Sequence, residues 1–229
     1  MPAPQSSQAP RHDLYGPVHK GLRRDMCSLL ARIGSADFST AAQASEIVKD
    51  LHGILELCAH HLEHENTFLH PAVDERSKGA SSKQAQEHEE HEKFIAKLRT
   101  MATELEKSSD NDRAAKGQQL YLHFSAFVGE NLVHMAEEEG VLQPKLQASY
   151  SDNELRAIEG KLLGSMKPEV MMAFLRGMIP AMNREERAML LGGMKQGAPP
   201  EAFNAVLQVA ARPTLSAEDY SDLTKRLGV

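Results

Sequence analysis

The sequence predicts an all-α protein in two parts. One is a four-helix domain over residues 13–147, built as a duplicated helical hairpin, and the other is a C-terminal extension of short helices over residues 150–229. Three observations support this division. Apolar residues recur at helical spacing in four long stretches of the first part. One His/Glu pattern occurs in both halves of that part. Beyond residue 150 the helical segments become short and are separated by Gly, Pro and capping residues. We expect residues 1–12 to be a flexible N-terminus.

The four long helices are predicted in order from their apolar faces and their end signals. The first begins near Pro17, a residue suited to a first turn, and stops at Gly34. The second starts around residues 37–39 and ends at Pro71. The third follows the polar segment DERSKGASSK and stops at SSDND, and the fourth ends near Pro144.

Capping patterns predict the short C-terminal helices. Ser151-x-x-Glu154 and Ser216-x-x-Asp219 both have the form of a capping box. Seven of the eleven methionines lie between Met166 and Met194, which suits either core filling or a soft contact surface, and we favour core filling. This segment carries no recognisable chemistry. We expect it to pack on its own chain or to form a homodimer.

Composition and charge exclude several classes of function. The formal charge is −6 and the sequence has no Lys/Arg block, so nucleic acid is not an expected partner. No apolar run approaches the roughly 18 residues that span a bilayer, and the start has no apolar signal region. We therefore expect a cytoplasmic protein without membrane contact. Cys27 and Cys58 are too few for a disulfide framework and form no CxxC motif.

A repeat of histidine and glutamate carries the chemistry. All eleven histidines lie in the stretch from His12 to His134. The pattern H-x-x-x-E, followed by two apolar residues and Pro, starts once at His61 and again at His134. A further histidine lies on the helix before each pattern, His19 in the first half and His91, at nearly the same offset, in the second.

This spacing suits metal binding, because residues i and i+4 lie on one helix face about 6 Å apart. Antiparallel packing of each hairpin brings the histidine of one helix near the H-x-x-x-E of the next, which creates two half-sites side by side. Imidazole and carboxylate ligands suit Fe, Mn or Zn, and a carboxylate can bridge two ions about 3.5–4 Å apart. The candidate metal ligands are His19, His61, Glu65, His91, His134 and Glu138.

These residues resemble those of the hemerythrin-like (HHE cation-binding) domains, over roughly residues 13–147. The resemblance implies an up-and-down four-helix bundle around two iron ions with an oxo or hydroxo bridge, for which Zn or Mn can substitute. It also implies an open position where O₂, NO or peroxide can bind. By position, it implies one iron at His19 and His61, a second at His91 and His134, and two bridging carboxylates, Glu65 and Glu138.

One departure from the family changes the expected chemistry. Oxygen-carrying hemerythrins place a second histidine one turn before the third-helix ligand, and this sequence has Glu87 there. Glu87 either binds the metal or leaves a position open, and His88 is the other additional candidate. Anionic ligands favour the ferric state, so we expect sensing or protection rather than reversible O₂ carriage. Around the ligands, Glu130 either accepts the ring N–H of His134 or lies at the solvated edge of the bundle, and Tyr15 is a candidate for a hydrogen bond near the metal.

The leading functional hypothesis is a di-iron protein that binds or responds to O₂, NO or peroxide, in oxygen or iron sensing or in defence against oxidative or nitrosative stress. One alternative is a peroxide-consuming or iron-oxidising di-iron enzyme, so enzyme activity stays open. The ferritin-like form of that class uses E-x-x-H pairs, which this sequence lacks. The other alternative is a non-catalytic, metal-stabilised interaction module, although structural zinc sites normally have four Cys or His ligands.

Overall fold

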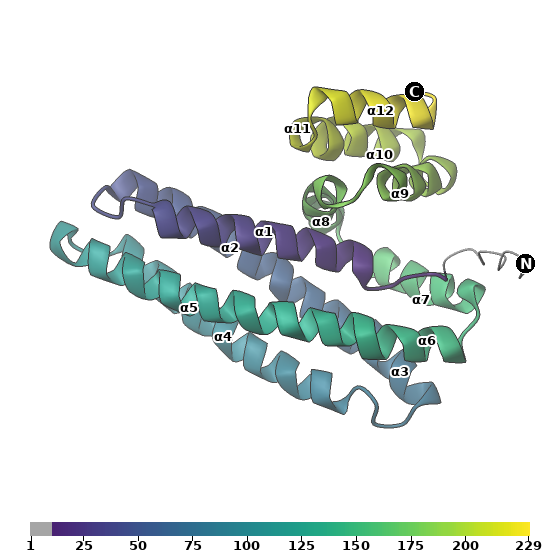
Figure 1. Cartoon of the computed structure of the whole chain (residues 1–229), viewed down its shortest axis with the longest axis horizontal. Helices are drawn as coiled ribbons and strands as arrows, with labels where there is room; N and C mark the ends of the chain where they lie inside the picture. Colours follow the sequence, from purple (N-terminus) through teal and green to yellow (C-terminus); the bar gives the residue numbers. More distant parts are fainter. Residues whose placement is uncertain (1–10) are drawn as a thin grey trace, which may run out of the picture.

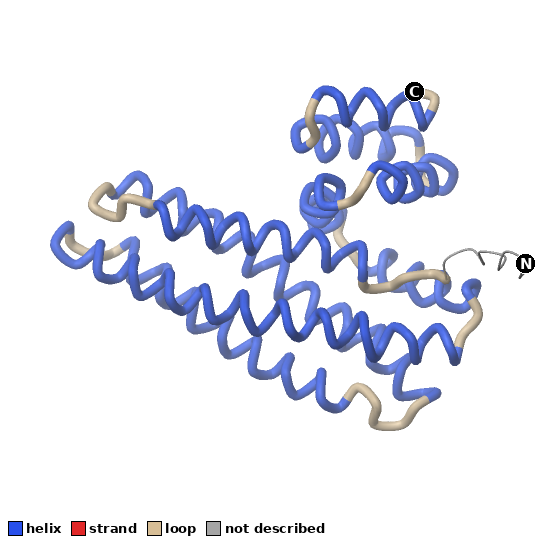
Figure 2. Tube along the Cα trace, viewed as in Figure 1, coloured by secondary structure: helices blue, strands red, loops and turns tan. Residues whose placement is uncertain are grey.

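The structure, a computed structural model, describes residues 11–229, and all regular structure in that range is helical (Figure 2). This confirms the prediction of an all-α fold. Of the segment predicted as a flexible N-terminus, residues 1–10 lie outside the described residues. Arg11 is held in place, because its guanidinium donates hydrogen bonds to the Asp152 carboxylate and to the carbonyl oxygens of Gln147 and Tyr150.

Four long helices form an antiparallel bundle. Each of them packs against two of the others, so that α1 contacts α2 and α5, and α4 contacts the same two helices (Figure 1). This closed ring fits an up-and-down arrangement in which consecutive helices are neighbours. Their bounds are α1 Gly16–Ser35, α2 Ala41–His64, α4 Ser82–Glu106 and α5 Asp110–Glu137.

The second and fourth helices do not end at their prolines, contrary to prediction. Instead α2 continues through the π-helical turn η1 (Glu65–Leu69) into α3 (His70–Arg76), and α5 continues through η2 (Glu138–Leu142) into α6 (Gln143–Ser149). Pro71 and Pro144 lie in the first turns of α3 and α6. Proline lacks an N–H and its ring clashes with the carbonyl of residue i−4 in an α-helix. We attribute its tolerance here to the wider π-helical turn that precedes each proline.

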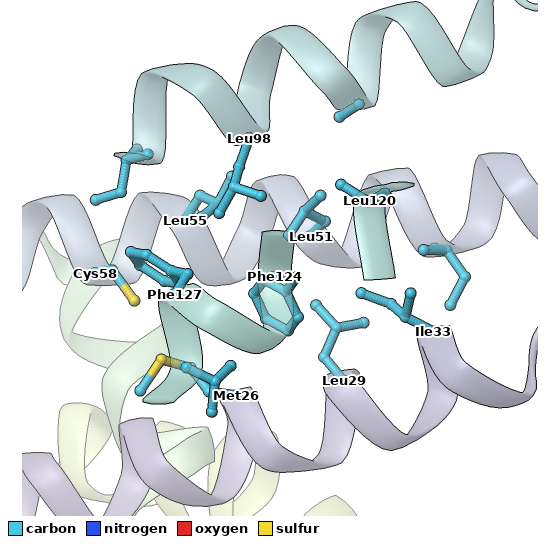
Figure 3. Close-up of a cluster of buried hydrophobic side chains, with 14 of the residues drawn as sticks. Met26, Leu29, Ile33, Leu51, Leu55, Cys58, Leu98, Leu120, Phe124 and Phe127 are labelled. Atoms are coloured by element: carbon cyan, nitrogen blue, oxygen red, sulfur yellow. The ribbon is translucent and has the colours of Figure 1, made fainter. Parts of the chain in front are cut away.

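An apolar core fills the bundle away from the metal ligands. Side chains from all four long helices meet there, with Phe124 and Phe127 of α5 at its centre and Leu51 and Leu55 of α2 beside them (Figure 3). The two phenylalanine rings stack with centroids 6.1 Å apart. Full burial of each such side chain contributes about 1.5–3 kcal/mol, so this end of the bundle supplies much of the fold's stability.

The C-terminal part is a set of short helices. Residues from Leu175 onward share an apolar core of their own, whereas Leu155 is buried with Leu69 and Leu142 of the bundle. The predicted capping box at Ser151 is present, and the hydroxyl of Ser216 accepts a hydrogen bond from the Asp219 N–H as predicted. Asn183 forms a further capping box with Glu186 that the sequence did not reveal. The elements are α7 Asp152–Ser165, α8 Pro168–Ala181, α9 Arg184–Gly197, α10 Pro200–Ala205, η3 Val206–Ala211, α11 Arg212–Thr214 and α12 Ala217–Leu227.

The C-terminal helices dock on the bundle where α8 crosses α1 (Figure 1). The crossing is close because glycine lies on both helices. A Cβ on Gly21 would lie 2.9 Å from the backbone nitrogen of Met178, and one on Gly177 would overlap the Asp25 carboxylate. Most methionines of this region are at least partly buried, as core filling requires, while Met189 is 71% exposed. Within residues 11–229 every helix is too short or too polar to cross a membrane.

Candidate metal centre

Six buried histidine and glutamate side chains meet inside the bundle. They form two groups of four, and within each group the ligand atoms all lie within 4.8 Å of one another. The two groups share Glu65 and Glu138, which begin the π-helical turns η1 and η2. The first group is His19, His61, Glu65 and Glu138, and the second is Glu65, His88, His134 and Glu138.

The first group is compact. The Nε2 atoms of His19 and His61 lie 3.2 Å apart. Glu65 Oε1 lies 3.4 Å from the Nε2 of His19 and 3.3 Å from that of His61. Glu138 Oε2 lies 3.4 Å from His19 Nε2, so both carboxylates reach this group.

The second group has closely similar geometry. The Nε2 atoms of His88 and His134 lie 3.0 Å apart. Glu138 Oε1 lies 3.2 Å from His134 Nε2, and Glu65 Oε2 lies 3.4 Å from His88 Nε2. The two oxygens of each carboxylate thus point to different groups, which is the disposition a bridging ligand requires.

The buried carboxylates fit a site for cations. Among residues 11–229, the four side-chain oxygens of Glu65 and Glu138 have no partner with hydrogen-bond geometry, although imidazole nitrogens lie nearby. Burial of a carboxylate without a compensating partner is costly. A pair of divalent or trivalent cations supplies that compensation, and the nitrogen and oxygen donor set suits Fe, Mn or Zn.

When no cation is bound, protonated histidines balance the negative charge of the carboxylates. Burial lowers the pKa of His19, but its hydrogen bond to Glu139 and the nearby Glu65 outweigh this effect and raise the pKa to about 9. His88 behaves alike, since Glu138 and Glu65 overcome burial and raise its pKa to about 9. Burial raises the pKa of Glu65, yet the surrounding imidazoles prevail and lower it to about 2. At neutral pH the imidazolium groups of His19 and His88 therefore balance the two carboxylates, and Glu138 and Glu87 raise the pKa of His134 in the same direction.

Two other imidazoles, those of His61 and His91, are neutral at that pH. Burial lowers the pKa of His61 to about 4, and Glu65 offsets only part of the effect. The pKa of His91 falls to about 4 for the same reason, with the neighbouring His134 adding to the shift. A neutral imidazole is the form that binds metals. His61 is thus ready to donate its lone pair without losing a proton.

Outer hydrogen bonds orient the ligand rings of His19 and His88. His19 Nδ1 donates to Glu139 Oε1 at 2.9 Å, and Arg23 donates to the same oxygen at 2.5 Å. His88 Nδ1 donates to Asn66 Oδ1 at 2.8 Å. Asn66 and Glu139 each directly follow a shared carboxylate, so the internal repeat extends to these two residues. Such partners fix the tautomer of a ligand histidine and its orientation.

Five of the six predicted ligands lie in the two groups, and His88 takes the place expected for His91. The two residues are three positions apart on α4, close to one turn, so an apolar stripe alone does not separate them. The position of α4 along the bundle distinguishes them. In the structure His88, and not His91, occupies the place in the second group that His19 occupies in the first. His91 is buried, with its ring edge-on to that of His134 at 4.9 Å between centroids. Its role as a ligand stays a prediction.

The predicted outer residues have different positions. Glu130 is exposed, and the ring of His134 donates instead to Glu87 Oε2 at 2.8 Å. Glu87 therefore lies outside the two ligand groups and orients one of their members. Tyr15 is completely buried beside His19, with 5.4 Å between ring centroids. Its hydroxyl has no hydrogen-bond partner in the described part of the chain.

A helical bundle with two carboxylates shared between two pairs of histidines defines a class of metal-binding proteins. The family model of the hemerythrin HHE cation binding domain matches residues 17–146. This match covers more than half of the chain, which belongs to that family. Comparison with curated proteins and with solved structures gives no match.

Proposed function

We propose that this protein holds two iron ions, joined by the shared carboxylates and by an oxo or hydroxo bridge, and that it binds a small oxidant such as O₂, NO or peroxide there. Its role in this proposal is sensing or protection against oxidative or nitrosative stress. The observation that carries the proposal is the sharing of Glu65 and Glu138 between two buried groups of ligands.

The chain's own residues prepare the site for this role. Iron supplies the redox chemistry when bound. Glu139 and Asn66 hold the rings of His19 and His88 with their Nε2 atoms toward the shared carboxylates. The large apolar core and a smaller apolar cluster around Tyr15 restrict the access of water to the centre.

The donor set favours oxidation chemistry over reversible O₂ carriage. Two carboxylates contribute to each group, and anionic oxygen ligands stabilise the ferric state. A peroxide-consuming enzyme would use the same centre, so the reaction with peroxide decides between the two roles.

The proposal is tested by loading the metal-free protein with Fe(II) without oxygen, measuring iron per chain, and then adding O₂, peroxide or NO. We expect two irons per chain and a change in the visible and near-ultraviolet spectrum with at least one reactant. Repeated turnover of peroxide would identify an enzyme. Glu138→Gln should lower the iron content, whereas Glu130→Gln, an exposed glutamate on the adjoining helix, should not.

Fewer than two irons per chain, or a loaded protein that responds to none of the three reactants, would overturn the proposal. Equal iron loss in Glu130→Gln and Glu138→Gln would also contradict the assigned site.

A further inference from the structure

A histidine outside the predicted ligand set lies at the metal centre. His70 is the first residue of α3 and is 5% exposed. Among the described residues, neither of its ring nitrogens has a hydrogen-bond partner. Its Nε2 lies 3.8 Å from Glu138 Oε1, an oxygen that also faces His134 and His88. Burial of an imidazole without a partner is costly, and an ion bound beside it is one way to offset that cost.

The π-helical turn is what brings His70 to the centre. In an uninterrupted α-helix, five residues would place His70 roughly 140° around the axis from Glu65. The π-helical turn adds one residue, and the backbone N–H of His70 donates to the carbonyl of Glu65. The separation then closes to roughly 40–50°, so both side chains lie on the inner face of the helix.

The ring of His70 is placed beside the second ligand group. It stacks on the ring of His88, with 4.7 Å between centroids and 27° between planes. Two donor atoms on one ion, each about 2.1 Å from it, lie at most about 4.2 Å apart. The distance of 3.8 Å between His70 Nε2 and Glu138 Oε1 is within that limit, and His70 lies at the edge of the second group, outside the four side chains whose ligand atoms all lie within 4.8 Å of one another.

The duplicated half of the chain has a different residue at this position. Gln143 is the counterpart of His70 in the repeat that relates His61 to His134, and it follows the second π-helical turn. Its side chain faces the N-terminal segment, where it accepts a hydrogen bond from the Leu14 N–H and donates one to the carbonyl of His12. In one half the residue after the π-helical turn is therefore an amide with hydrogen-bond partners. In the other half it is an imidazole without a partner among the described residues.

We propose that His70 is an additional metal ligand, donating through Nε2 to the ion held by His88, His134 and the shared carboxylates. This inference rests on the proposed function, because it assumes that the second group holds an ion. It makes the two positions unequal, since the second position has one more nitrogen donor than the first.

The test compares His70→Gln, which copies the residue of the other half, with the wild type and with His60→Gln. His60 lies on the outside of α2, where its ring nitrogens are near Glu56 and Glu63 and its ring stacks on that of His64. Each protein is titrated with Co(II) against a competing chelator, and the imidazole N–H resonances shifted by the bound Co(II) are counted by proton NMR. Circular dichroism of the metal-free proteins verifies the fold.

Wild type should bind two Co(II) ions. We expect His70→Gln to bind one of the two at least about 10-fold less tightly and to bind the other with an affinity within about twofold of wild type. It should also lose one shifted imidazole resonance, while His60→Gln should match wild type. Unchanged affinities, or weaker binding with every shifted resonance retained, would overturn the inference. A wild type that binds fewer than two ions would instead contradict the proposed function.

Discussion

The protonated histidines of the metal centre predict an unusual pH dependence for the metal-free protein. The perturbation is removal of metal with a chelator, followed by a rise in pH from 7 to 8.5. His19 and His88 have a pKa of about 9 in the folded protein, against 6.5 for an ordinary histidine. Because the folded protein holds these protons more tightly than the unfolded chain, their stabilisation is complete below pH 6.5. It is lost as pH rises through 9.

The magnitude follows from those values. Between pH 7 and 8.5 each of the two histidines loses roughly 2 kcal/mol of stabilisation. Glu65, with a pKa of about 2, and His61, with a pKa of about 4, keep nearly constant charge over this range. The pKa of the buried Cys58 thiol is raised to about 12, so this group also stays neutral. The free energy of unfolding should therefore fall by roughly 2–4 kcal/mol.

The assay is urea unfolding of the metal-free protein at pH 7 and at pH 8.5, with the metal-loaded protein as the matched control. In the loaded protein cations replace the protons, so its stability should not fall over the same interval. His19→Gln removes one of the two histidines and should reduce the decline by about half. A metal-free protein whose unfolding free energy is the same at both pH values, or a loaded protein that declines equally, would refute the charge balance assigned to this site.

Three further predictions concern the surroundings of the site. Glu87→Gln should weaken metal binding by about 10- to 100-fold in a chelator competition, because Glu87 orients His134, while Glu130→Gln should have no effect. Gly21→Ala should lower the unfolding free energy by about 1–3 kcal/mol in urea, since its Cβ would meet the backbone of α8. Gly129→Ala is the control, because no atom of the described chain lies within 4 Å of its added Cβ. Tyr15→Phe should raise the unfolding free energy of the metal-free protein by about 1 kcal/mol in urea, because it removes a buried hydroxyl without a partner, and a loss would show that this hydroxyl is paired.

The fold and most of the site could be predicted because both depend on short-range spacing. Apolar residues at helical intervals identify the long helices, and His61 with Glu65 share a face at any point of a regular helix. The register between helices is a different matter. The choice between His88 and His91 depends on how far α4 slides along its neighbours, and packing over the whole bundle sets that distance. For the same reason Glu130 seemed a suitable partner for His134, although Glu87 reaches the ring from another helix.

The π-helical turns are the second feature that could not be predicted from the sequence, and they affect the metal site more than the register does. Pro71 predicts a helix end, because proline in an α-helix loses a hydrogen bond and clashes with the preceding turn. The structure accommodates Pro71 by widening the turn before it, so the helix continues and His70 enters the site. The same device in the other half brings Gln143 inward, where it binds the N-terminal segment instead. The two halves share this backbone but differ in the side chain that follows the π-helical turn. That side chain is an imidazole 3.8 Å from Glu138 in one half and an amide bonded to the N-terminal segment in the other, and this difference is what would make the two metal positions unequal.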